Sequence, residues 1–149
     1  MTTFKLLLAT VLVGILTTAF SQHNHNEEKK TTPSAMTFDL VLSQALSDAE
    51  LTDFKVESVI MTIAPGVLDT VSHRHDCELF GYVLEGNVQI ALTTKELKEF
   101  SAGQMFYEKR NILHTVTKNV SDTTAAKILL VFIIKNGRLG YTAEYPAKN

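Results

Sequence analysis

Three histidines in this sequence are spaced so that they could hold one metal ion. His73 and His75 are separated by a single residue, and His114 lies much further along the chain, in a second predicted strand. On an extended strand, residues two apart project from the same face, so the first two imidazoles can converge on one ion. Imidazole nitrogens suit Zn, Fe, Cu or Ni and suit Ca or Mg poorly. The alternative is three surface or core histidines whose rings are satisfied by hydrogen bonds.

Two carboxylates lie close to these histidines in the sequence. Glu78 follows His75 with two residues between them, so it either reaches the ion from a shortened turn or faces solvent. Glu108 precedes His114 and is a candidate metal ligand or catalytic base. The alternative for Glu108 is an ordinary charge at the end of a strand.

Two further residues accompany the histidine pair. Arg74 stands between the two histidines, so on a strand it points away from them and is expected to be a surface charge. Cys77 shares the odd-numbered register of His73 and His75. It is therefore a candidate ligand, a redox-sensitive neighbour of the site, or a small packed side chain.

The elements that must position these residues are predicted to be short strands separated by tight turns. Pro65-Gly66 and the sequence from Glu85 to Asn87 are typical turn signals. Only residues 43–53 favour a short helix or helical turn, and no helical pattern lies between strands. The predicted strands are 55–64, 79–84, 88–93, 104–108, 113–117 and 127–135, the last apolar on both faces as in a buried strand. This pattern indicates an all-β sandwich or barrel.

The order of motifs resembles that of the cupin family. The first cupin signature is matched by Gly66, His73-Arg74-His75, Glu78 and the run Tyr82 to Gly86; the second is matched by Gly103, Lys109-Arg110-Asn111, His114 and Asn119. The resemblance extends from Phe38 to Ile134. It implies a double-stranded β-helix, or jelly-roll barrel, with a metal inside. The ligands that it implies are His73, His75, His114 and, less regularly, Glu78, around one divalent transition metal: Fe, Mn, Zn, Ni or Cu.

The sequence departs from the cupin pattern at two places. Cupins usually place a metal-binding glutamate three or four residues beyond the second histidine, but the position aligned from the end of that signature is Leu79. The usual proline and glycine of the second signature are Lys109 and Asn111, and asparagine tolerates the left-handed conformation that glycine would adopt. Without Glu78, the site would have three histidines and an open face for water, oxygen or substrate, as catalytic metals require.

The resemblance implies a class of reactions rather than one reaction. Cupins of this kind include dioxygenases, isomerases and decarboxylating lyases, all acting on small molecules. An enzyme would need an open metal position facing a pocket, with Glu108 or Glu78 within hydrogen-bond reach. The alternatives are a non-catalytic barrel that binds a small ligand or a metal, and a metal-free barrel that mediates interactions. Side chains that either line the cavity or belong to the plain core are Phe80, Tyr82, Met105, Phe106 and Tyr107.

Composition limits the class of protein further. The chain has 149 residues, of which 45% are hydrophobic, so it can form one domain with a substantial core. Its 14 basic and 16 acidic residues give a net charge of −2, which argues against a nucleic-acid partner. A single cysteine excludes an intrachain disulfide and any zinc site built from several thiolates.

The first residues are predicted to direct export. Lys5 is followed by an uncharged run from Leu6 to Phe20 and by small residues typical of a cleavage site. The run is shorter than the ~20 residues of a membrane span, so residues 1–21 are interpreted as a cleaved signal rather than an uncleaved anchor. This predicts a periplasmic or secreted bacterial protein with no stable membrane span. Residues 22–35 are predicted to be a flexible leader, and residues 36–149 the barrel. Small cupins commonly pair through their outer strands, and a partner covers an exposed strand edge, so the resemblance implies a homodimer.

Overall fold

Every regular element that the structure describes is a β-strand. The structure is a computed structural model, and it describes residues 34–93 and 96–144. The strands are β1 (Met36–Ala45), β2 (Phe54–Ile63), β3 (Leu68–Asp69), β4 (His73–Arg74), β5 (Glu78–Glu85), β6 (Asn87–Leu92), β7 (Leu97–Ser101), β8 (Met105–Glu108), β9 (His114–Asn119), β10 (Ala126–Lys135) and β11 (Thr142–Ala143). Each strand expected from the sequence is present, with bounds that differ by no more than two residues.

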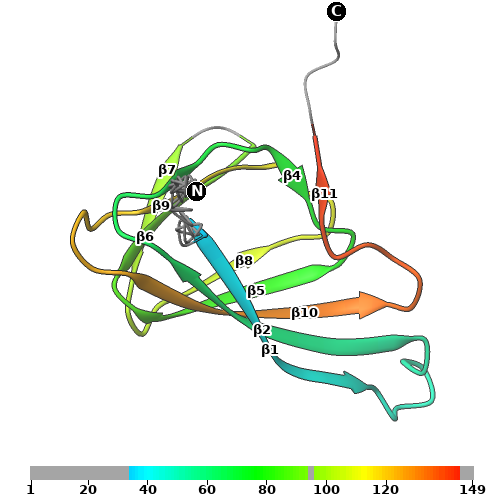
Figure 1. Cartoon of the computed structure of the whole chain (residues 1–149). Helices are drawn as coiled ribbons and strands as arrows, with labels where there is room; N and C mark the ends of the chain where they lie inside the picture. The colour runs from blue at the N-terminus through cyan, green and yellow to red at the C-terminus, as the bar shows by residue number, and fades with distance from the viewer. Residues whose placement is uncertain (1–33, 94–95, 145–149) are drawn as a thin grey trace, which may run out of the picture. The chain divides into compact units, whose positions relative to one another are not determined.

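The strands form two sheets (Figure 1). One sheet has the order β1-β2-β10-β5-β8, and the other has the order β11-β4-β9-β6-β7, with β3 also paired to β9. All pairings among the described strands are antiparallel. Many neighbouring strands are distant in the sequence, as β2 and β10 are. This two-sheet sandwich confirms the predicted all-β class and is consistent with a double-stranded β-helix.

The core lies on the inner faces of the two sheets, where side chains alternate with outward-facing ones. In β5, Leu79 and Val83 are buried, whereas Tyr82 and Leu84 are exposed. The opposite sheet contributes Val88 of β6 to the same hydrophobic cluster. Odd-numbered positions of β5 therefore point into the sandwich and even-numbered positions point out of it.

Gly81 is the odd-numbered position of β5 without a side chain. It pairs in register with Phe106 of β8. A Cβ atom at Gly81 would lie 2.1 Å from the Phe106 ring, which is far closer than two carbon atoms can approach. Glycine here lets the aromatic ring of the neighbouring strand fill the core.

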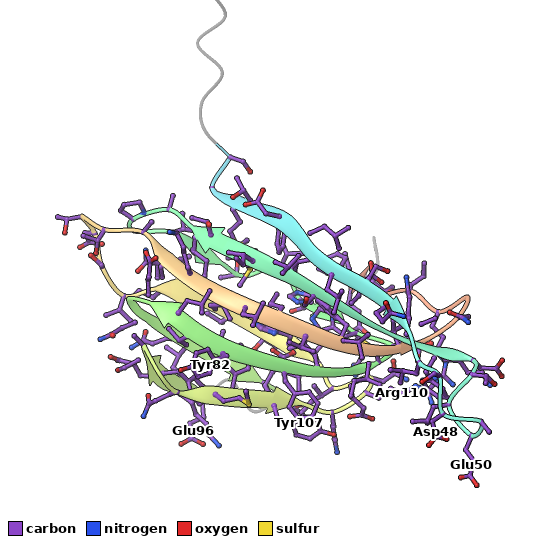
Figure 2. The ribbon with its side chains drawn as sticks, turned by 90° about the horizontal axis from the view of Figure 1, so that it is seen from below. Asp48, Glu50, Tyr82, Glu96, Tyr107 and Arg110 are labelled. Atoms are coloured by element: carbon purple, nitrogen blue, oxygen red, sulfur yellow. The ribbon has the colours of Figure 1, made fainter. Side chains whose placement is uncertain are left out.

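The helix expected within residues 43–53 is not formed. β1 stays paired with β2 to its last residue, where Ala45 faces Lys55. The residues between the two strands form turns: the Leu51 amide donates to the Asp48 carbonyl, and the Glu50 amide donates to the Asp48 side chain. Of the two alternatives, a short helix or a helical turn, the helix is absent because a segment this short, joining two paired antiparallel strands, must reverse direction rather than extend a helix. Asp48 and Glu50 lie at the tip of this hairpin (Figure 2).

The outer face of the five-stranded sheet is only partly shielded from solvent. Figure 2 views the molecule from this side and labels Tyr82 and Tyr107. β10 was expected to be buried on both faces, but this is true of its inner face alone: Ile128 is buried, while Leu129 and Val131 are half-buried. The physical reason is that, within the described residues, the second sheet packs on the inner face and no element packs on the outer one.

None of the described residues forms a helix that is long and apolar enough to cross a membrane. The predicted signal segment, residues 1–21, lies outside the described residues, as does most of the predicted leader. Export, signal cleavage and the boundary of the leader therefore stay predictions.

Candidate metal centre

The three histidines come from neighbouring positions at β4 and β9 of the six-stranded sheet. His73 begins β4 and His114 begins β9, and the two residues are register partners. His75 follows β4 by one residue, so it points to the same side as His73. All three are buried, with 7%, 8% and 5% exposure for His73, His75 and His114. The spacing and the strand pairing together bring the rings to one place.

The imidazoles converge. One ring nitrogen from each histidine lies within 4.8 Å of the corresponding atoms of the other two. The rings of His73 and His114 are stacked with centroids 4.6 Å apart, and those of His73 and His75 are edge-on at 4.9 Å. Three nitrogen donors that share one ion at about 2.1 Å must lie within about 4 Å of one another, so only small movements are needed.

Backbone carbonyls orient two of the rings. Nδ1 of His73 lies 2.9 Å from the carbonyl oxygen of Val71, and Nδ1 of His75 lies 2.5 Å from that of Gly140. Because a carbonyl can only accept a hydrogen bond, Nδ1 of each ring carries the proton. Nε2 is then left with its lone pair, as in protein metal sites where a second hydrogen bond fixes the ring.

The electrostatic environment also favours neutral rings. Burial lowers the pKa of His73 below its usual range, and the neighbouring histidines lower it further. Burial likewise lowers the pKa of His75, and its effect outweighs those of the Gly140 hydrogen bond and the Glu108 carboxylate, which raise the pKa. Both rings are thus neutral near neutral pH, which is the form that binds a metal ion.

Glu108 places a buried carboxylate within this cluster. Its Oε1 lies 2.9 Å from Nδ1 of His114, and its Oε2 lies 3.8 Å from Nε2 of His75. The residue is 2% exposed, and Oε2 has no hydrogen-bond partner within the part of the chain that the structure describes. The other nitrogen of His114, Nε2, lies 2.8 Å from the Thr117 hydroxyl and 2.9 Å from the Val116 carbonyl.

This donor set fits a divalent transition metal. Three converging imidazoles are soft enough for such ions, and two of them present free lone pairs. The buried Oε2 of Glu108, which has no hydrogen-bond partner among the described residues, is a polar atom that a cation would satisfy. His73, His75 and His114 would hold the ion.

A cavity of about 660 Å³ adjoins the cluster. Its wall includes the three histidines and Glu108, together with apolar side chains from both sheets such as Met61, Leu79, Ile90, Phe106 and Phe132. Charged groups of Lys55, Glu57 and Arg138 also border it. The volume is in the range of small-molecule sites.

The family model for the cupin domain matches residues 59–132. This chain is a cupin-domain protein. The matched segment contains all three histidines and Glu108. No curated protein sequence matches the chain.

Solved structures share the cupin fold at low sequence identity. An uncharacterized conserved protein with a double-stranded beta-helix domain from Klebsiella pneumoniae is 16% identical, with a TM-score of 0.59, covering 77% of this chain and 89% of that one. DMSP lyase DddQ from Ruegeria pomeroyi is 13% identical, with a TM-score of 0.52, covering 63% and 45%. An oxalate oxidase in complex with the substrate analogue glycolate is 22% identical, with a TM-score of 0.54, covering 75% and 56%. This cupin spans less than two thirds of either enzyme, and the likeness shows the fold alone.

Glu78 is not brought to the histidines of this cupin. It lies at an even-numbered position of β5 and therefore on the outer face, where the Tyr107 hydroxyl donates to its carboxylate. The Arg110 amide also donates to it, at 3.4 Å. The expectation that Glu78 would reach the ion from a shortened turn thus fails in this structure, because the strand alternation directs Leu79 inward instead.

The other predicted residues divide between the site and its surroundings. Cys77 is buried but lies outside both the histidine cluster and the cavity wall, and burial raises the pKa of its thiol to about 11. Arg74 points away from the site and pairs with Glu144, as expected of a surface charge. Of the proposed lining side chains, Phe106 borders the main cavity, whereas Phe80, Tyr82, Met105 and Tyr107 do not. Those four side chains lie at the positions of β5 and β8 that point away from the core.

The segment near the C-terminal end of the described chain contributes residues that sequence reasoning missed. β11 pairs with β4, which brings Gly140 and Tyr141 over the histidines. The Gly140 carbonyl orients His75, and the Tyr141 ring lies 4.7 Å from the His73 ring. A backbone carbonyl carries no residue-type signal, so no sequence motif could have identified Gly140.

Proposed function

We propose that this cupin holds one divalent transition metal with His73, His75 and His114 and acts on a small molecule bound in the adjoining cavity. The observation that carries the proposal is the convergence of three buried imidazoles on the wall of a cavity of about 660 Å³. The ion is Fe, Mn, Zn, Ni or Cu. Such an ion supplies a Lewis acid for a substrate oxygen or a centre for oxygen chemistry, which suits a dioxygenase, isomerase or lyase.

The protein's own contribution is to bind and orient. The carbonyls of Val71 and Gly140 hold two imidazoles in the tautomer that presents Nε2 to the site. Apolar side chains from both sheets line the cavity and would hold the apolar part of a substrate. Its polar oxygen would then face the histidines. The three histidines lie on the wall of the cavity, so an open position on the ion would face a bound molecule, and this favours catalysis over simple ligand capture.

Metal analysis tests the proposal. The parent protein is expected to carry close to one equivalent of a transition metal after purification, and His114→Ala is expected to lose most of it, because one of three nitrogen donors is removed. His25→Ala, in the predicted leader, is the matched control and should retain the metal of the parent. Equal metal content in the parent and in His114→Ala would contradict the assignment.

Substrate turnover separates an enzyme from a binding barrel. A panel of small carboxylic acids, enediols and sugars, followed by oxygen consumption and by mass spectrometry of the products, is expected to show at least one conversion that His114→Ala abolishes. Tight binding of a panel compound without conversion by the metal-loaded protein would favour the non-catalytic barrel.

We also propose that the mature protein is exported and forms a homodimer. The support for export is the uncharged run from Leu6 to Phe20, and a reporter fusion that stays in the cytoplasm would contradict it. The support for the dimer is β1, an edge strand on which Phe38 and Leu40 are 59% and 65% exposed. Light scattering should give twice the chain mass for the parent and the monomer mass for Leu40→Lys. A monomeric parent at micromolar concentration would contradict the dimer.

A further inference from the structure

We infer that Glu108 of β8 is the fourth protein ligand of the metal, in place of a carboxylate at residue 79 of β5. This inference rests on the proposed three-histidine site. The cupin resemblance leads one to expect a ligand on the strand that follows the histidine pair, but that strand presents Leu79 inward and Glu78 outward. The carboxylate that does enter the cluster comes from the neighbouring strand.

The register of β5 and β8 explains how one strand can substitute for the other. Leu79 and Glu108 are direct Cα partners in this antiparallel pair. Side chains of directly paired residues project from the same face, with Cβ atoms about 5 Å apart. Both residues are almost fully buried, at 1% and 2% exposure. A carboxylate at position 108 can therefore reach the same part of the interior as one at position 79.

The position of the carboxylate agrees with ligation. It lies between two of the imidazoles, with Oε1 2.9 Å from His114 Nδ1 and Oε2 3.8 Å from His75 Nε2. Two donors that share one ion at about 2.1 Å lie about 3 to 3.4 Å apart, so the distance to His75 needs only a small adjustment. The group of donor atoms that all lie within 4.8 Å of one another comprises the three histidines, so Glu108 must also move toward His73 when the ion binds. If Glu108 served only to orient His114 through Oε1, nothing would explain a second oxygen that is buried, directed toward His75 and without a partner among the described residues.

A fourth protein ligand has a consequence for the choice of metal. Three imidazoles and one carboxylate fill the usual four-coordinate shell of Zn²⁺ and leave no place for a substrate. Ions that accept six ligands, such as Fe²⁺, Mn²⁺ or Ni²⁺, keep two positions open toward the cavity. The catalytically competent ion is therefore expected to be one of these, and zinc is expected to bind without supporting turnover.

Titration with Co²⁺ tests the inference by affinity and by visible absorption, independently of any activity. The variants are Glu108→Gln, which keeps the shape of the side chain but weakens it as a ligand, and Glu78→Gln, which makes the same change on the outer face. Glu108→Gln is expected to bind Co²⁺ at least about 100-fold more weakly than the parent, with an altered ligand-field spectrum. Removing a residue that only orients a ligand typically weakens metal binding by about 10- to 100-fold, and removing a ligand should weaken it more. Glu78→Gln should match the parent within about threefold.

A transposition variant provides the stricter test. Leu79→Glu combined with Glu108→Gln moves the carboxylate from β8 to β5. This double variant is expected to bind Co²⁺ at least about tenfold more tightly than Glu108→Gln alone. Circular dichroism establishes that each variant is folded. If the transposed variant does not fold, the inference is tested by Glu108→Gln alone, which is isosteric.

The outcomes separate this inference from the proposed function. Co²⁺ binding by Glu108→Gln within about threefold of the parent, or weaker binding with an unchanged spectrum, would overturn Glu108 as a ligand and leave the three-histidine site standing. A parent protein that binds no Co²⁺ would overturn the proposed metal site itself, and this inference with it.

Discussion

The β5–β8 strand pair carries two glutamates on opposite faces, and their surroundings are opposite as well. On the inner face, Glu108 is buried between His75 and His114. On the outer face, Glu78 is partly exposed and accepts a hydrogen bond from Tyr107. Glu78 is much nearer to the histidine pair in the sequence, yet Glu108 is the one that touches the histidines. Parity along the strand and register across it therefore decide which carboxylate can act on a metal.

The same division separates the apolar residues of the two faces. Inward positions of β5 belong to a continuous core cluster that contains Leu79, Val83 and, from β10, Ile128. Outward positions such as Tyr82 and Leu84 have no covering layer among the described residues. The inner face should therefore account for most of the stability and all of the metal chemistry, and the outer face should tolerate change.

The largest expected effect is on stability. Leu79→Ala should lower the free energy of unfolding by about 3 kcal/mol, because it leaves a cavity in the core beside the site. Leu84→Ala, five positions along β5 on the outer face, should cost less than about 1 kcal/mol. Urea unfolding of the metal-free proteins measures both. Similar losses for the two variants would contradict the assignment of inner and outer faces.

A smaller effect is expected when pH is lowered. Burial holds the pKa of His73 and His75 below the value of about 6.5 that they take in the unfolded chain. As pH falls below that value, the unfolded chain binds protons before the folded one does, so the free energy of unfolding of the metal-free protein should decrease between about pH 7 and pH 5. Replacing both residues by glutamine should flatten this dependence relative to the parent. An unfolding free energy that stays constant or rises over the same range would show that the rings are not buried as described.

The smallest expected effect concerns the outer face. The hydrogen bond to Glu78 raises the pKa of Tyr107, since the carboxylate stabilises the protonated hydroxyl. Glu78→Gln should return the pKa of Tyr107 toward its usual range without changing metal content. Ultraviolet titration, with Tyr107→Phe subtracted to isolate this tyrosine, measures the shift. If the pKa of Tyr107 were unchanged in Glu78→Gln, this would contradict the hydrogen bond between Tyr107 and Glu78.

Much of this arrangement could be predicted from local pattern. The period-two alternation and the turn residues around Pro65-Gly66 and Gly86 identified the longer strands other than β1. The separation of His73 and His75 by one residue predicted that both rings share a face. The alternation within β5 directs Leu79 inward and Glu78 outward, but a bend at Asp76 and Cys77 separates β5 from the histidine pair, so the parity of the histidines could not have excluded Glu78.

What local pattern could not supply is pairing between distant segments. β1 was not predicted, since it has no buried face, and only its pairing with β2 identifies it as a strand. The register of Leu79 with Glu108 depends on how two strands pair, and the Gly140 carbonyl reaches His75 from 65 residues away. These are tertiary relations, and they determine the orientation of His75 and the place of the carboxylate.

A crystal structure of the Mn²⁺-loaded protein, with anomalous data to locate the ion, tests the central claim most directly. We expect one anomalous peak, which marks an ion bonded at about 2.1 Å to His73, His75 and His114, with Glu108 as the fourth ligand. A peak at another place, or histidine rings that turn away from one another around an empty centre, would contradict it.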